Sequence, residues 1–116
     1  MVNMVMLVGR LTKDPEMVET ENGTKVSRVT LAINRMFKNS DGVYQTDYVD
    51  CVLWNNFAKN VSTYCSKGDL IGVRGRLQVD IYEKEGIKKK VTDVIAESIT
   101  FLSSNKNKEG TVLESN

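Results

Sequence analysis

The chain has 116 residues, of which 41% are hydrophobic and 27% charged, which is the composition of a single globular domain. Its formal net charge of +1 shows no excess of either sign, so any electrostatic site must come from local clusters of charge. It contains no histidine, and its only cysteines, Cys51 and Cys65, form no CxxC pair. The commonest general base is therefore missing, a zinc knuckle or a disulfide framework is disfavoured, and both cysteines are predicted to be core residues.

The first predicted strand covers residues 4–11. The N-terminus has no basic region and no cleavage-like site, so neither a signal peptide nor a membrane span is predicted, and the expected location is the cytoplasm. The polar segment over 12–25 holds the only proline and an Asn22-Gly23 turn signal, and is predicted to be a loop.

The second predicted strand covers residues 26–37, where apolar and polar residues alternate, and a turn at Asp41-Gly42 follows it. The third strand is DYVDCVLW, residues 47–54. Successive side chains of a strand point to opposite faces, so one face of this strand is a plain aliphatic row. The other face carries Tyr48, Asp50 and Trp54, and this mixture fits either a core under a helix or a surface that binds something flat and apolar.

A change of period after Trp54 predicts a short helix. Phe57, Val61 and Tyr64 recur at i, i+4 and i+7, so all three are predicted to face the core. Lys67 and Gly68 are typical of a helix end, since a cation suits the last turn and glycine tolerates positive φ.

A fourth strand over 70–82, a hairpin around Gly86 and a last strand over 91–102 complete the predicted elements. We therefore predict one domain over 1–103 and a disordered polar tail over 104–116. The order of three strands, one helix and two strands favours an all-β, five-stranded OB-fold (oligonucleotide-binding) barrel with the short helix between strands 3 and 4. SH3-like barrels and split sheets remain alternatives on pattern alone. The tripeptide Gly-Arg-Leu occurs at 9–11 and 75–77, and chance explains this better than an internal repeat.

Nothing in the sequence gathers catalytic groups. Carboxylate pairs such as Asp14 and Glu16 lie in polar connections, without a nucleophile or a Gly-rich phosphate loop nearby. We therefore predict that the protein is not an enzyme and has no metal or other cofactor.

Binding is the better class, because aromatic side chains lie close to cations in the predicted strands. Arg74 and Arg76 share one face of the fourth strand, which suits phosphate contacts, although a solvated outer face gives the same pattern. Trp54 is equally compatible with a core position at the junction of strand and helix. Exposed aromatic rings with nearby cations are the combination that binds single strands of nucleic acid with little sequence preference.

Four segments together resemble the bacterial-type single-stranded DNA-binding protein family. They are the segments that contain VGRLTKDPE, VTLAINRMFKN, DYVDCVLW with GVRGRLQ, and YEKEGIKKK, and the resemblance runs from about Val2 to Leu102. It implies an OB barrel that assembles as a homotetramer and binds single-stranded DNA without reading bases and without a cofactor, in replication, recombination or repair.

The resemblance also implies roles for particular residues. The stacking aromatics of the family correspond to Phe37, Tyr48, Trp54 and Tyr82. The residues assigned to the DNA backbone are Arg10, Arg35, Arg74, Arg76, Lys84 and Lys88, and those assigned to the oligomer interface are Asn3, Val5 and Leu7.

Several positions depart from the family pattern. Many relatives carry one or two basic residues after the tryptophan, where this chain has Asn55 and Asn56. They often carry a basic residue before the aromatic of the fourth strand, where this chain has Asp80 and Ile81. Asp50 replaces a common asparagine and lies on the aromatic face itself. Each lost cation removes about one phosphate contact and lowers the salt slope by roughly 0.7, so we expect weaker or less salt-sensitive binding than in a typical relative. Either Asp50 pairs with a cation such as Arg74 or Arg76, or the site is weakened.

The chain also lacks the acidic tip that closes many relatives and recruits other proteins, so no such recruitment is predicted. A natural short form and a truncated form remain alternatives. The competing function is an OB-fold oligomer that serves as a protein-interaction scaffold with weakened nucleic-acid binding. RNA binding also stays open, since stacking does not depend on the sugar.

Overall fold

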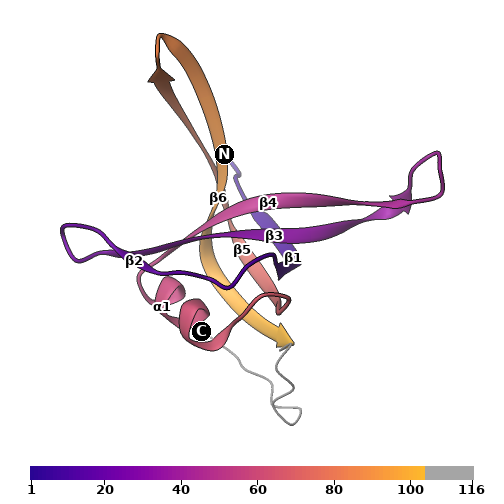
Figure 1. The fold of residues 1–116 in the computed structure, drawn as a ribbon, viewed down its shortest axis with the longest axis horizontal. Coiled ribbons are helices and arrows are strands. Elements are labelled where there is room, and N and C mark those ends of the chain that lie inside the picture. Colours follow the sequence, from indigo (N-terminus) through magenta and orange to yellow (C-terminus); the bar gives the residue numbers. More distant parts are fainter. Residues whose placement is uncertain (104–116) are drawn as a thin grey trace.

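Five strands close into a barrel in the computed structural model, which describes residues 1–103 (Figure 1). The tail predicted over 104–116 lies outside the described residues. The elements are β1 (Val5–Leu11), β2 (Val18–Glu19), β3 (Lys25–Lys38), β4 (Tyr44–Trp54), α1 (Asn56–Tyr64), β5 (Leu70–Lys84) and β6 (Ile87–Ser103).

Strand pairing makes the closure explicit. β1 pairs antiparallel with both β3 and β5, β5 pairs antiparallel with β6, β6 pairs parallel with β4, and β4 pairs antiparallel with β3. The short β2, which the sequence pattern did not predict, pairs only with the start of β3. The ring of β1, β3, β4, β6 and β5, with one helix between β4 and β5, confirms the predicted OB-fold barrel.

Two long hairpins extend beyond the barrel as arms. The arm of β3 and β4 points to the right in Figure 1, and the arm of β5 and β6 points to the top. The predicted hairpin over residues 83–90 is almost entirely strand, because only Glu85 and Gly86, both with positive φ, form its turn. The strands are therefore longer than predicted, and the arms carry side chains away from the core.

The barrel core is aliphatic. Leu31, Leu53, Ile71 and Ile99 are at most 1% exposed, and burying each such side chain contributes about 1.5–3 kcal/mol of transfer free energy. The predicted core positions of the cysteines are confirmed, since both are buried and free. Burial raises the pKa of the Cys51 thiol to about 12, so this group stays protonated and unreactive.

The helix α1 packs Ala58 and Val61 fully into the core, with Phe57 half-buried beside them. The prediction that Tyr64 faces the core was wrong, because this residue is 46% exposed. Its ring and the Phe101 ring form an edge-to-face pair with 6.5 Å between centroids. The helix ends at Tyr64, and the extended Cys65 that follows fills the core position instead.

The end of α1 also differs from the prediction at Lys67 and Gly68. Gly68 has a φ of 90° as expected, but it belongs to the turn after the helix. There its N–H donates to the Leu11 carbonyl at 2.8 Å and ties this turn to β1. No helix within residues 1–103 is long and apolar enough to cross a membrane.

Close packing of neighbouring strands explains why both Gly-Arg-Leu tripeptides begin with glycine. A Cβ on Gly9 would lie 2.8 Å from the Ala32 carbonyl oxygen, and a Cβ on Gly75 would overlap the backbone carbonyl of Ile95. Glycine inside a strand is expected where another backbone approaches closely or where a barrel strand bends. Both glycines thus allow neighbouring strands to approach, without any repeat of the fold.

The junction between β4 and α1 is strained at Asn55. This residue has φ 56° and ψ −121°, a conformation that glycine adopts far more easily, and its side chain makes no capping hydrogen bond to α1. We expect Asn55→Gly to raise the free energy of unfolding by about 1 kcal/mol, measured by urea denaturation. Asn56→Gly, at the first residue of the helix, should not raise it, because this residue has helical φ and ψ and glycine relieves no strain there. A loss of stability in Asn55→Gly would contradict the assigned strain.

Candidate nucleic-acid interface

The outward face of β4 presents two aromatic rings. Tyr48 is 69% exposed and Trp54 is 40% exposed, and both point away from the core side that holds Cys51 and Leu53. Ala32, opposite Tyr48 on β3, is too small to cover the ring. The core alternative for Trp54 is thus not what the structure shows, and both rings offer a flat surface to a ligand.

Arg10 reaches the same face as Tyr48 through the strand register. It pairs with Ala32, which in turn pairs with Tyr48, and directly paired residues place their side chains on one face. The Arg10 guanidinium also donates to the Gly68 carbonyl at 2.9 Å, which fixes its position at this edge.

Arg76 joins the face from the other side. It pairs with Ile95, which pairs with Val52 between the two aromatics, so a row runs from β4 across β6 to β5. The Arg76 guanidinium donates to Gln78 Oε1 at 2.9 Å and is half-buried. Arg74, two residues before Arg76 on the same outward side of β5, pairs with Met6 of β1.

The remaining residues assigned to DNA binding lie on the arm of β5 and β6, on two different faces. Tyr82 is 46% exposed, and Lys84 lies two residues later on its face of the arm. Lys88 pairs with Glu83 and therefore lies on the opposite face. Lys89 pairs with Tyr82, so the cation beside this ring is Lys89, which was not among the residues assigned to the DNA backbone. A two-residue turn at 85–86 fixes this register, and that turn was the signal available in the sequence.

The arm of β3 and β4 carries Phe37, which is 81% exposed, beyond an irregularity in the pairing after Asn34. Arg35 does not accompany Tyr48. Its guanidinium donates to the Asp47 carboxylate at 2.9 Å and to Gln45 Oε1 at 2.8 Å, on the face opposite to Tyr48.

The contact with Arg35 lowers the pKa of Asp47 from its ordinary value of 3.8 through the hydrogen bond between them. A carboxyl with a lowered folded pKa adds stability above its unfolded pKa and loses it as the pH falls through the folded value. We expect the Asp47 pKa to rise toward 3.8 in Arg35→Gln, measured by NMR titration of the carboxyl carbon. The stabilities of the two proteins should converge only under acidic conditions, and an unchanged Asp47 pKa would contradict the contact.

Asp50 lies between Tyr48 and Trp54 and accepts a hydrogen bond from Thr30 Oγ1 at 2.7 Å. Of the two alternatives left open by the sequence, pairing of Asp50 with Arg74 or Arg76 is not what the structure shows. Within residues 1–103 the ion pairs join Arg28 to Asp93 and Arg35 to Asp47, so this carboxylate lacks a cationic partner there. A fixed negative charge therefore sits among the aromatics.

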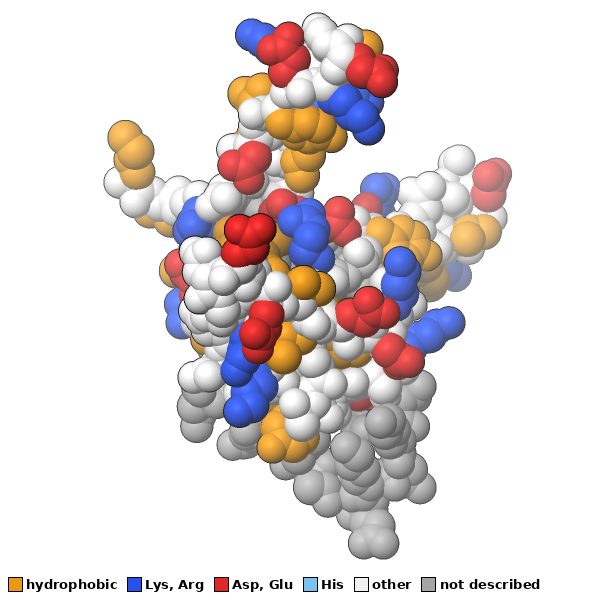
Figure 2. Space-filling model, turned by 60° about the vertical axis from the view of Figure 1, so that its left-hand side comes forward, with side chains coloured by type: hydrophobic (Ala, Val, Ile, Leu, Met, Phe, Trp, Pro, Cys, Tyr) orange, Lys and Arg blue, Asp and Glu red, His pale blue; other side chains and the backbone are white. Residues whose placement is uncertain are grey.

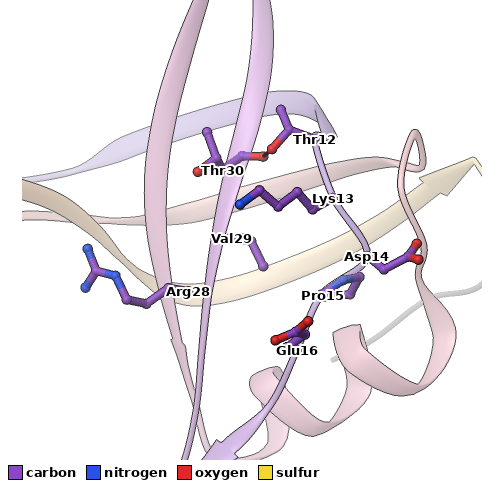
Figure 3. Close-up of a pocket in the computed structure, with 8 residues that line it drawn as sticks. All are labelled: Thr12, Lys13, Asp14, Pro15, Glu16, Arg28, Val29 and Thr30. Atoms are coloured by element: carbon purple, nitrogen blue, oxygen red, sulfur yellow. Dashed lines mark hydrogen bonds between the residues drawn. The ribbon is translucent and has the colours of Figure 1, made fainter.

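A polar pocket of about 410 Å³ adjoins this face, lined by residues 12–16 and by Arg28, Val29 and Thr30 (Figure 3). Lys13 extends toward β3, whereas Asp14 points the other way and accepts from the Lys67 N–H at 2.8 Å. The pocket shares Arg28 and Thr30 with the outward face of β3. A nucleic-acid strand bound to that face would therefore have a polar surface beside it.

Charges of both signs are interspersed over the molecule, without a continuous basic stripe on the side shown in Figure 2. Asp80, on the β5 arm, accepts from Gln78 Nε2 at 3.2 Å. Hydrophobic side chains gather on the arm at the top of this view, where Leu77, Val79, Ile81 and Ile87 are exposed.

The residues assigned to the oligomer interface lie along β1 and just before it. Val5 and Leu7 are half-buried and pack against the barrel core. Asn3 exchanges two hydrogen bonds of 2.8 Å with the backbone of Leu77 and thereby extends the pairing of β1 with β5. The outward side chains along this segment are Met4, Met6 and Val8, which are 63%, 74% and 54% exposed.

Comparisons with known proteins agree with this geometry. A model described as the single-strand binding protein family matches residues 2–102. Single-stranded DNA-binding protein B of Bacillus subtilis (strain 168) is 52% identical over 103 residues, which cover 88% of this chain and 91% of that protein. Single-stranded DNA-binding protein 3 of Listeria innocua is 48% identical over 111 residues, covering 95% of this chain and 69% of the relative.

A solved structure is also similar. It is the crystal structure of a deletion mutant of the single-stranded DNA binding protein from Thermus aquaticus, with a TM-score of 0.75 and 33% sequence identity. The match covers 90% of this chain and 52% of that chain, so the present chain spans about half of its length. The single-stranded DNA-binding protein of Bacillus cereus is 50% identical, and the match covers 61% of it.

Proposed function

The chain belongs to the single-strand binding protein family, and we propose that it binds single-stranded DNA by stacking bases on exposed aromatic rings and contacting phosphates with nearby cations. The function is one of binding, without catalysis. The observation that carries the proposal is the shared outward face of Tyr48 and Trp54, with Arg10 and Arg76 brought to it by strand register.

The stacking surface extends in our proposal along both arms. Phe37 and Tyr82 are exposed on separate hairpins, so a strand that leaves the barrel face meets another ring in either direction. Lys84 and Lys89 lie on the face of Tyr82 and would contact the phosphates there. Because every base has a π face, such a surface binds different sequences, which suits the protection of single strands in replication, recombination or repair.

The cations contribute unequally in this proposal. Arg10, Arg76 and Lys84 are on the faces that carry the rings. Arg74 shares the outward side of β5 with Arg76 but lies beside Met6 of β1, and Lys88 is on the other face of its arm, so both would meet DNA only if it wraps around the molecule. Arg35 must release Asp47 before it can contact a phosphate.

We also propose that the protein acts as a homotetramer, and that β1 contributes an interface through its outward side chains. Met4, Met6 and Val8 form an exposed apolar stripe, which a second copy would cover. Static light scattering should give a mass about four times the 13.0 kDa of the chain. A monomeric mass at working concentration would contradict this assembly. A cytoplasmic location, also proposed, is supported by the two buried cysteines, which are free thiols.

The test of the function is a competition experiment. Fluorescein-labelled oligo-dT is bound by the protein, its anisotropy is recorded, and unlabelled oligo-dT, duplex DNA of the same length or the matched RNA is added. We expect oligo-dT to displace the label and duplex DNA to leave it bound, because the bases of a duplex are stacked on each other. Absence of binding to oligo-dT would favour the scaffold function, and equal competition by RNA would extend the function to both nucleic acids.

A further inference from the structure

Asp50 is the one carboxylate on the outward face of β4 between the two rings. It is exposed, and its Oδ1 atom accepts a hydrogen bond of 2.7 Å from Thr30 Oγ1, directly across the strand pair. This contact orients the carboxylate without neutralising it, since the ion pairs within residues 1–103 involve other groups. A directed, charged acceptor thus stands where bases are proposed to stack.

The spacing places this acceptor next to a stacked base. Side chains two residues apart on a strand are about 6.8 Å apart on the same face, so Asp50 is one such step from Tyr48. On the opposite strand Ala32 lies beside Tyr48 and Thr30 beside Asp50, and neither is large enough to hold a base away from the carboxylate. A base lying on the Tyr48 ring therefore has its edge within reach of Asp50.

The chemistry of a carboxylate restricts what it tolerates at this position. It only accepts hydrogen bonds and it repels phosphate, so the strand must turn base edges toward it. Cytosine offers an N4 amine, adenine an N6 amine, and guanine its N1–H and N2 amine. Thymine has one donor on this edge, its N3–H, which lies between the O2 and O4 acceptors. At the position of the cytosine amine it presents O4, which faces the carboxylate without a hydrogen bond.

We propose that Asp50, positioned by Thr30, gives this surface a base preference, favouring bases with an exocyclic amine over thymine. The inference rests on the proposed function, since it requires single-stranded DNA on this face. It names a specificity-determining residue on a surface whose other contacts are indifferent to sequence.

The experiment compares two oligomers of equal length that differ at the group being read. One contains 5-methylcytosine and the other thymine, so both carry the C5 methyl group and only the N4 amine, the O4 oxygen and the N3 proton distinguish them. Dissociation constants are measured by anisotropy at about pH 8, where aspartate is ionised and the cytosine ring neutral. The readout is the ratio of the two constants in the wild type and in Asp50→Asn.

We expect Asp50→Asn to bind both oligomers more tightly, because a negative charge is removed, but to reduce the preference for 5-methylcytosine by about fivefold or more. Thr30→Val should reduce the preference part of the way, because it leaves the charge and removes the hydroxyl that orients it. Asp41→Asn, which removes the same charge from the tip of the β3 and β4 arm, should leave the ratio unchanged.

Two results would overturn the inference. An equal ratio in the wild type and in Asp50→Asn, with both still binding, refutes base reading by Asp50 while leaving single-strand binding intact. A change of equal size in Asp41→Asn refutes it by assigning the effect to net charge. Absence of binding to both oligomers by the wild type itself would instead overturn the proposed function together with the inference.

Discussion

Replacement of Tyr48 by alanine is expected to weaken binding of single-stranded DNA by about 1–3 kcal/mol, roughly a 5- to 150-fold loss, for the base that stacks on it. The Tyr48 side chain is 69% exposed, so its removal opens no cavity and should leave the free energy of unfolding within about 0.5 kcal/mol of the wild type. Titration by anisotropy and urea denaturation of the same samples measure the two quantities.

Tyr64 provides the control, because it is also an exposed tyrosine but lies on α1, away from the aromatic face. Tyr64→Ala loses the edge contact with Phe101 and should lower stability by about 1 kcal/mol without changing affinity for oligo-dT. Equal losses of affinity in Tyr48→Ala and Tyr64→Ala would show that the outward face of β4 is not a stacking surface.

A large effect on stability is expected from a single methyl group at Gly75. Its Cβ would overlap the carbonyl of Ile95, which is backbone and cannot swing aside, at the point where the register of β5 and β6 shifts. Gly75→Ala should therefore lower the free energy of unfolding by about 3 kcal/mol, a large part of the stability of a small domain. Urea denaturation with a fitted midpoint and slope measures it.

Gly72, three residues earlier on the same strand, is the control position. Its replacement measures the general effect of adding a methyl group to β5, without the overlap expected at Gly75. A Cβ there would meet Leu102 and Thr100 at 3.7 Å, which is ordinary van der Waals contact. Gly72→Ala should stay within about 1 kcal/mol of the wild type. If Gly75→Ala were equally mild, the close approach of the two strands would be contradicted.

The fold was predictable because its signals are local and repeated. Alternation along β3, with Val29 and Leu31 inward, and the changed period at Phe57 and Val61 each specify an element and its buried face. Turn residues with positive φ, such as Gly42, mark the hairpins. Three strands, one helix and two strands in this order can cover their exposed sheet edges in few ways, and a closed barrel is one of them.

The site was less predictable, because the pairing of strands decides which exposed residues are neighbours. The alternation of side chains along a single strand could not show that Arg35 would bind Asp47 on the face opposite Tyr48. Nor could it show that Lys89 would lie beside Tyr82. The resemblance also could not decide which residues of β1 point outward. Val5 and Met6 are both hydrophobic neighbours, and only the structure shows that Val5 points inward and Met6 outward. Such relations depend on register, which requires the turns to be placed to the residue.

Asp50 illustrates the same limit in electrostatics. The alternation of side chains along the strand placed it among the aromatics, and a cationic partner and a weakened site were the two alternatives. In the structure its hydrogen-bond partner is the hydroxyl of Thr30, directly across the strand pair. A threonine orients a carboxylate without cancelling its charge. The consequence for binding is therefore a specific acceptor on the surface rather than a neutral patch.

Intrinsic fluorescence of Trp54 tests the central claim most directly, because it is the only tryptophan of the chain and lies on the proposed stacking face. During titration with oligo-dT, a base stacked on the indole should quench its emission strongly, whereas a duplex of the same length should leave the emission unchanged. Unchanged emission with oligo-dT, together with unaltered affinity in Trp54→Ala, would contradict the claim that single-stranded DNA binds to this face.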